Sequence, residues 1–220
     1  MRRALALAMR GWGRTAPNPL VGAVVVRDGE IVGEGWHAEY GGDHAEVTAL
    51  RSAGALARGA TMYVTLEPCN HHGLTGPCSD AVVIAGISRV VVATSDQNPV
   101  AAGGAARMRA GGTDVEFGVE EDAALELNAP FLHSLRSDRP FVQLKVALSL
   151  DGAIADASRR PGWLTGTAAR LEVHRLRAGA DAIAIGIGTA LADDPQLTVR
   201  DVPLPRVPPL RVIFDGTARL

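Results

Sequence analysis

A histidine, a glutamate and two cysteines form the most informative pattern in this chain of 220 residues. His44 and Glu46 are separated by one residue, and Cys69 and Cys78 follow further along the sequence. One histidine and two cysteines can supply three protein ligands to Zn²⁺ and leave a fourth position open for water. Zinc lowers the pKa of such a water, and a carboxylate placed like that of Glu46 can carry protons beside it. The pattern therefore predicts hydrolytic deamination, in which hydroxide replaces an amino group on a ring carbon.

The spacing of the cysteines leaves other roles open. Zinc deaminases commonly carry Cys-x-x-Cys, whereas residues 70–77 separate Cys69 from Cys78. The two thiols could form a disulfide, although nothing in the sequence indicates an oxidising compartment. They could also be buried thiols without a metal. His71 or His72 could complete a structural site with four protein ligands, but Glu46 would then have no role.

Strands and helices must bring these residues together. A helix is expected to begin at His44, and a second at Cys78, ahead of the apolar run 81–85. The positive end of a helix lowers the pKa of a nearby thiol and favours metal binding. The expected apolar face of the first helix comprises Val47, Leu50, Gly54 and Ala57. Strands are expected at residues 20–26, 30–36 and 61–66, and a hairpin turn at Asp28-Gly29 joins the first two. A short helix is expected between Gly103-Gly104 and Gly111-Gly112.

Three segments of the first half are distinctive: Ala16-Pro17-Asn18-Pro19-Leu20-Val21-Gly22, His44-Ala45-Glu46, and the run from Thr65 to Cys78. They resemble the deaminase half of the bifunctional riboflavin-biosynthesis deaminase/reductase family, in which a long insertion between the cysteines is usual. The resemblance implies that His44, Cys69 and Cys78 bind zinc, that Glu46 is the proton shuttle, and that Asn18 contacts the substrate. The amide of Asn18 offers a donor and an acceptor to a pyrimidine edge, although a plain turn residue is the alternative.

The resemblance also implies a small-molecule substrate, 2,5-diamino-6-(5-phosphoribosylamino)pyrimidin-4(3H)-one. Deamination would replace its 2-amino group with oxygen and give 5-amino-6-(5-phosphoribosylamino)uracil. Two alternatives are a zinc deaminase of another base or nucleoside (cytosine, guanine or adenosine in tRNA) and a non-catalytic zinc-stabilised binding module. The roles of His71 and His72 stay open.

The second half reads as a further α/β unit. We expect a buried strand at residues 141–148, a helix at 167–178, and strands at 181–189 and 210–216. Gly186-x-Gly188 by itself is weak support for a nucleotide site, because a short turn explains it equally well.

Lys145–Gly152 and Leu191–Arg200 resemble the reductase half of the same family, which has a dihydrofolate-reductase-like fold and uses NADPH to reduce a ribosyl unit to a ribityl chain. Guanidinium groups suit the 5-phosphate of the substrate, although solvated surface charge is the alternative. Pro161 stands where the family usually has a small polar residue. The resemblance implies that Ala147, Trp163, Thr189, Asp193 and Gly216 lie at the cofactor, and that Arg177, Leu197 and Arg200 lie at the substrate.

The expected fold class is α/β. Residues 1–138 are expected to form a cytidine-deaminase-like three-layer domain, and residues 139–220 the N-terminal part of a dihydrofolate-reductase-like α/β domain. The second part is short for an α/β domain, which commonly needs about 100–150 residues. The family continues through a glycine-rich segment that has no counterpart here. We therefore expect the sequence to be a piece of a longer protein, and the alternative is a reductase half that is not functional.

Composition narrows the class of partner. The net charge is −2, the pI is near 6.3 and aromatic residues make up 4% of the chain, so we expect no nucleic-acid binding. Arg10 interrupts the apolar N-terminal run, which favours an amphipathic helix over a signal peptide, and no apolar stretch is long enough to span a membrane. A thiol pair that serves zinc fits the cytoplasm. The resemblance implies self-association, which is common in the family, and an incomplete second domain would also expose apolar surface, so we expect a homo-oligomer.

Overall fold

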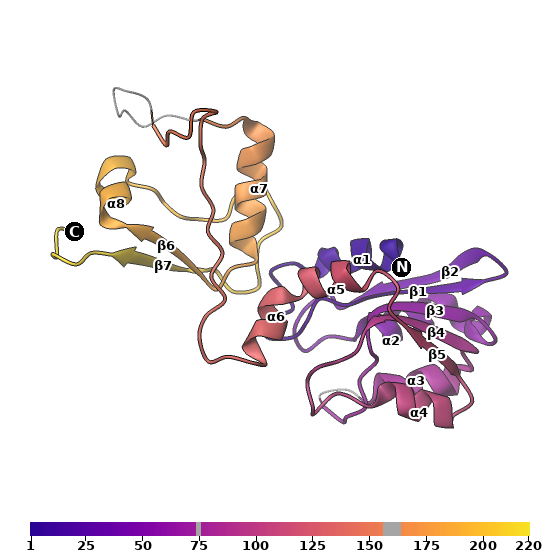
Figure 1. Ribbon diagram of the computed structural model, residues 1–220. Helices are drawn as coiled ribbons and strands as arrows, with labels where there is room; N and C mark the ends of the chain where they lie inside the picture. The colour runs from indigo at the N-terminus through magenta and orange to yellow at the C-terminus, as the bar shows by residue number, and fades with distance from the viewer. Residues whose placement is uncertain (74–75, 156–163) are drawn as a thin grey trace. The chain divides into compact units, whose positions relative to one another are not determined.

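The computed structural model describes residues 1–73, 76–155 and 164–220. The chain divides into two compact units, Met1–Phe141 and Val142–Leu220 (Figure 1). The first unit is built on a five-stranded sheet in the order β2-β1-β3-β4-β5. Strand β1 pairs antiparallel with β2 and β3, whereas β3, β4 and β5 are parallel. The strands are β1 (Gly22–Arg27), β2 (Glu30–Trp36), β3 (Thr61–Leu66), β4 (Arg89–Thr94) and β5 (Asp114–Phe117).

Helices cover both faces of this sheet, which confirms the predicted three-layer α/β domain (Figure 1). Successive side chains of a strand point to opposite faces, and β1 shows this directly. Val24 packs with Ala4 and Leu7 of α1, while Val25 belongs to the main core beneath α2, α3 and α4. The helices are α1 (Arg2–Ala8), α2 (Ala45–Ala53), α3 (Cys78–Ala85), α4 (Gly104–Ala110), α5 (Glu121–Leu127) and α6 (Ala129–Ser134), with short 3₁₀ helices η1 (Met9–Gly11) and η2 (Gly54–Ala57).

Helix α2 packs unusually close to β2 because β2 carries glycine on the facing side. A Cβ atom at Gly33 would lie 2.4 Å from the carbonyl oxygen of Ala49, and one at Gly35 would lie 2.2 Å from that of Ala45. The buried stripe of α2 consists of Ala45, Ala49 and Ala53. The predicted apolar face is confirmed at Val47 and Leu50, which are partly buried and pack against core clusters, and at Ala57, which is buried. It is wrong at Gly54, which is exposed and ends the helix. Close backbone contact leaves room for methyl groups and none for larger side chains.

The sequence predicted well the other elements around His44, Cys69 and Cys78. Asp28 and Gly29 have φ angles of 53° and 85°, as a tight hairpin turn between β1 and β2 requires. Strands β2 and β3 have the predicted bounds, α3 begins at Cys78, and the glycine pairs bracket α4. Helix α1 confirms the predicted N-terminal helix.

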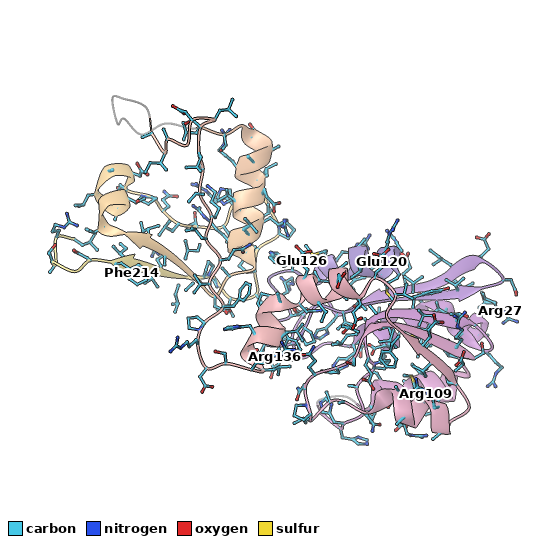
Figure 2. All side chains as sticks on the ribbon, in the orientation of Figure 1. Arg27, Arg109, Glu120, Glu126, Arg136 and Phe214 are labelled. Carbon is cyan, nitrogen blue, oxygen red and sulfur yellow. The ribbon has the colours of Figure 1, made fainter. Side chains whose placement is uncertain are left out.

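The second unit contains α7 (Thr167–Ala178), β6 (Ala182–Gly186), α8 (Ile187–Asp193) and β7 (Leu210–Phe214). Helix α7 has the predicted bounds. Strand β6 is shorter than predicted, because Ile187 already begins α8. Strands β6 and β7 are parallel, and Gly186 faces Phe214 at their carboxyl ends, where Figure 2 labels Phe214.

The predicted buried strand at residues 141–148 is wrong. Those residues form no strand, and Val142 and Leu144 are 81% and 84% exposed. A buried strand needs neighbours that accept and donate its backbone hydrogen bonds. In the described residues of this unit, the sheet consists of β6 and β7 alone. Across the described ranges of both units, no helix is long and apolar enough to cross a membrane.

Candidate metal centre

Three elements of the first unit deliver the predicted metal ligands to one place. His44 is the residue before α2, Cys69 follows β3, and Cys78 is the first residue of α3. The Nδ1 atom of His44 lies 3.1 Å from the Sγ of Cys78 and 3.6 Å from the Sγ of Cys69. One ligand atom from each residue lies within 4.8 Å of the other two. Residues far apart in the sequence therefore form one ligand cluster.

The donor set of this cluster fits zinc. Imidazole nitrogen and thiolate sulfur are the ligands that zinc favours in proteins, and three protein ligands are typical of its catalytic sites. Both cysteines are free, so the disulfide alternative is wrong. Neither His71 nor His72 belongs to the cluster as the structure describes it, so the four-ligand alternative finds no support there.

Hydrogen bonds within the cluster stabilise negative charge on Cys69. The Cys78 thiol and the backbone N–H of Cys78, whose nitrogen lies 3.4 Å from the Cys69 Sγ, both donate to that sulfur. Together with His44 they lower the pKa of Cys69 to about 4, against the opposing effect of burial. The pKa of Cys78 is raised, because its thiol donates to Cys69 and is buried. The pKa of His44 is raised mainly by its hydrogen bond with Cys69. A cation bound here would hold both sulfurs as thiolates.

Glu46 lies in the first turn of α2 and is 3% exposed. Burial is the main reason that the pKa of its carboxyl group rises to about 7. The charge of His44 opposes this rise only in part, and no arginine or lysine of the described chain forms an ion pair with Glu46. A buried carboxyl group with a pKa near neutrality can hold and release a proton at physiological pH.

A cavity of about 260 Å³ opens beside the cluster, lined by residues that include Asn18, His37 and Glu46. The Nδ1 of His37 lies 3.0 Å from the carbonyl oxygen of Asp43, which can only accept a hydrogen bond, so Nδ1 carries the proton. The Nε2 of His37 then accepts a hydrogen bond from the Nδ2 of Asn18, at 3.1 Å. Burial lowers the pKa of His37 and keeps the ring neutral. Asn18 therefore uses its Nδ2 for the bond to His37, and its Oδ1 takes no part in that bond.

His37 and Glu67 are two site residues that the sequence did not single out. The carboxylate of Glu67 accepts hydrogen bonds from the backbone N–H groups of Ala105 (2.8 Å) and Asp96 (3.3 Å). These bonds tie the segment that carries Cys69 to the start of α4 and to the loop after β4. The sequence does contain a signal for both residues, because each is a polar residue directly after an apolar strand: His37 follows β2 and Glu67 follows β3.

The second unit brings some of its predicted residues together. On α7, the guanidinium Nη1 of Arg177 donates to the carbonyl oxygen of Thr198 at 3.0 Å, two residues before Arg200.

Thr189 and Asp193 lie on α8, directly after β6, and Gly216 follows β7. Because β6 and β7 are parallel, these two connections leave the same edge of the sheet. Leu197 is buried, Ala147 lies in the irregular segment before residue 150, and Trp163, like Pro161, lies outside the described residues.

Two family models match the chain. The cytidine and deoxycytidylate deaminase zinc-binding region matches residues 1–94, and the RibD C-terminal domain matches residues 140–220. These matches confirm the expected order of a cytidine-deaminase-like domain and a reductase-type domain.

Curated relatives and solved structures agree with the family matches. The riboflavin biosynthesis protein RibD of Aquifex aeolicus is 49% identical over 216 residues, covering 98% of this chain and 60% of that protein. The Escherichia coli RibD protein is 53% identical over 201 residues, covering 91% of this chain and 55% of that protein.

A diaminohydroxyphosphoribosylaminopyrimidine deaminase/5-amino-6-(5-phosphoribosylamino)uracil reductase from Thermotoga maritima superposes with a TM-score of 0.88 at 46% identity, covering 98% of this chain and 62% of that one. A RibD structure from Acinetobacter baumannii gives 0.83 at 48% identity, covering 100% of this chain and 63% of that one. The chain thus spans less than two thirds of the length of these relatives.

Proposed function

Because the chain belongs to the RibD family, we propose that its first unit is a zinc-dependent deaminase of riboflavin biosynthesis. Its substrate would be 2,5-diamino-6-(5-phosphoribosylamino)pyrimidin-4(3H)-one, and its product 5-amino-6-(5-phosphoribosylamino)uracil. Support comes from the names of similar proteins and from the zinc-binding region matched over residues 1–94. In this proposal residues 1–138 form the deaminase domain.

His44, Cys69 and Cys78 would hold the zinc ion through one nitrogen and two sulfur atoms. When bound, zinc would supply an activated water as the nucleophile. Helix α2 fixes His44, since its backbone carbonyl accepts a hydrogen bond from the N–H of Thr48 at 3.1 Å. The backbone N–H of Cys78 holds Cys69 in the same way. Both bonds limit the movement of the ligands before any metal binds.

Glu46 would move the protons of the reaction through its carboxyl oxygens. Its ionised form accepts a proton from water, and its protonated form delivers one to the departing amino group, so one group serves both steps. Its pKa of about 7 makes both forms accessible near neutral pH. Asn18, held by His37, would accept or donate a hydrogen bond at the pyrimidine edge.

The observation that carries this proposal is the cluster of three zinc-type ligands beside a buried carboxyl group and a cavity. The test is an assay of the zinc-loaded 220-residue chain on the diaminopyrimidinone phosphoriboside, with ammonia and the aminouracil product quantified. We expect conversion without NADPH. Absence of conversion, together with turnover of cytosine, guanine or a tRNA adenosine substrate, would assign another zinc deaminase; a zinc site closed by a fourth protein ligand would indicate a binding module.

For residues 139–220 we propose the N-terminal part of an NADPH-dependent reductase domain, supported by the family match over residues 140–220. Arg177, Leu197 and Arg200 would lie at the phosphorylated substrate. The cofactor would lie at the carboxyl ends of β6 and β7, a common place for ligands in parallel sheets, where Thr189, Asp193 and Gly216 are found. Ala147 and Trp163 complete the proposed cofactor residues. Titration of the chain with NADPH, followed by fluorescence, tests whether this part alone binds the cofactor.

We further propose a cytoplasmic homo-oligomer that acts on a small molecule and not on nucleic acid. Two free thiols suited to zinc fit a reducing compartment, and a chain with a net charge of −2 lacks the overall basic character that favours nucleic-acid binding. Exposed apolar side chains at residues 142–150 favour self-association. Light scattering coupled to size-exclusion chromatography measures the oligomeric state.

A further inference from the structure

Two arginines of the second unit lie near each other without acidic partners. Burial and the neighbouring charge of Arg200 lower the pKa of Arg177. Among the described residues of this unit, the ion pairs are those of Arg175 with Glu172 and of Arg219 with Asp215, and neither includes Arg177 or Arg200. Two like charges held together cost free energy unless an anion binds between them. A phosphate group would remove that cost.

The contacts between α7 and the loop at residues 196–200 explain how the two arginines are held together. The Nη1 of Arg177 donates to the carbonyl oxygen of Thr198 at 3.0 Å. The Nδ1 of His174, one turn earlier on α7, lies 3.1 Å from the backbone nitrogen of Arg200 and 3.2 Å from the same carbonyl oxygen of Thr198. His174 therefore touches the backbone of the residue whose side chain carries the second positive charge.

Elementary hydrogen-bond rules fix the tautomer of His174. A backbone N–H can only donate, so the Nδ1 of His174 must accept from Arg200. The same atom cannot also donate to Thr198, and Thr198 is already served by Arg177, which can only donate. His174 is thus neutral with its proton on Nε2, an assignment that follows from the network of partners.

We infer that His174 is a positioning residue, which holds the backbone of Arg200 so that Arg177 and Arg200 together bind the phosphate of the reductase substrate. The inference rests on the proposed function, since it takes the ligand to be a sugar phosphate. His174 touches neither substrate nor cofactor in this role. It acts through the loop, and loss of its Nδ1 acceptor frees the N–H of Arg200.

The conformation of the loop explains why such an anchor is needed. Leu197 has a φ angle of 53°, in the left-handed region that residues with a branched apolar side chain rarely adopt, and its side chain is 6% exposed. A strained conformation persists only where surrounding contacts fix it, and such residues concentrate at ligand sites. The bonds from His174 and Arg177 to residues 198–200 supply those contacts.

Asparagine and glutamine at position 174 separate this role from a general structural one. The amide of asparagine can place an acceptor near the position of Nδ1, whereas that of glutamine reaches toward the position of Nε2. Glutamine has the higher helix propensity. A loss confined to His174→Gln therefore cannot come from a weaker α7.

The experiment uses the full 220-residue chain with ribose 5-phosphate as the probe and ribose as the control without phosphate. Nuclear magnetic resonance follows the amide of Arg200 during titration, and the ¹⁵N resonances of His174 report its tautomer. We expect saturable binding of ribose 5-phosphate alone, an unprotonated Nδ1, and near wild-type affinity for His174→Asn. We expect His174→Gln to bind about three- to tenfold more weakly, the range that one hydrogen bond provides, and to exchange the Arg200 amide proton faster.

A protonated Nδ1 in the wild-type chain overturns the inference, as does His174→Gln with wild-type affinity, or His174→Asn as weak as His174→Gln. Unchanged amide resonances of β6 and β7 show that a variant is folded. Should a variant fail to fold, the tautomer in the wild-type chain decides. Absence of ribose 5-phosphate binding to the wild type, with the Arg200 bond intact, refutes the proposed phosphate site and the role of His174 at it. That outcome leaves the deaminase proposal standing.

Discussion

Replacement of Gly35 by alanine should disturb the metal centre from the far side of α2. The added Cβ would lie 2.2 Å from the carbonyl oxygen of Ala45, 2.4 Å from the backbone nitrogen of Ala49 and 2.9 Å from the Cβ of Thr48. Backbone atoms cannot rotate away, so α2 must move outward. Relief of the shortest contact to 3.4 Å, the lower limit of ordinary van der Waals contact, needs about 1.2 Å of movement.

Two effects of different kind should follow from that movement. Overpacking in a core costs about 1–3 kcal/mol, and for a unit of this size each kcal/mol lowers Tm by about 3 °C. His44 and Glu46 travel with α2, while Cys69 and Cys78 belong to other elements. A misplacement of about 1 Å can cost on the order of 10²-fold in rate. We therefore expect a lower Tm and a far lower deamination rate from a single methyl group.

The assay compares wild type, Gly35→Ala and Gly188→Ala at one temperature well below the lowest Tm. A methyl group added at Gly188 would have no neighbouring atom within 4 Å, and Gly188 lies in the second unit, so the same chemical change there should leave deamination and zinc content unaltered. Bound zinc is measured on each sample, to separate loss of metal from misplacement of Glu46. Gly35→Ala with wild-type Tm and wild-type rate would show that close packing of α2 on β2 does not position the site.

Three other perturbations test single features of the site. Glu46→Gln should lower the deamination rate by about 10²–10⁴-fold, the usual contribution of a general acid–base group, and keep zinc bound; loss of zinc instead would make Glu46 a ligand. Glu67→Gln should replace one of the two acceptor oxygens with an NH2 donor, so that either the N–H of Ala105 or that of Asp96 loses its acceptor. We expect a loss of stability of about 1–3 kcal/mol, seen as a lower Tm; an unchanged Tm would contradict the role given to this carboxylate. Zinc present at about 100 times its Kd should stabilise the folded chain by about 3 kcal/mol, and a chelator should remove that stabilisation. An identical Tm with and without the metal would contradict a site that binds zinc in the folded state.

The cluster of candidate metal ligands could be predicted because residue type and order in the sequence indicate its chemistry. His44, Cys69 and Cys78 form a set with few other uses, and the structure brings them within 4.8 Å of one another. Turn chemistry at Asp28-Gly29 and alternating apolar residues likewise depend on neighbours in the sequence. Elements of this kind are determined by residues close together in the sequence, so the sequence alone predicts them.

The missed and wrong predictions share another cause, since each depends on a partner that is distant in the sequence. Gly33 and Gly35 matter because α2 lies against them, and no local signal shows this. Glu67 matters because Ala105 and Asp96 come to it through the tertiary structure. The apolar run at residues 141–148 indicates burial and says nothing about which strand would cover it. Apolar patterning identifies what must be buried, whereas the location of its partner is a property of the whole fold.

Helix starts explain how this site accommodates buried acidic groups without arginine or lysine beside them. The ion pairs of the described first unit join exposed side chains, while the charges at the site meet backbone N–H groups. Cys69 accepts from the first residue of α3, and Glu67 accepts from the second residue of α4. The first N–H groups of a helix have no partner within the helix and carry a partial positive charge. Neutral backbone donors can thus stabilise the Cys69 thiolate and the Glu67 carboxylate beside a cavity whose described lining contains no arginine or lysine.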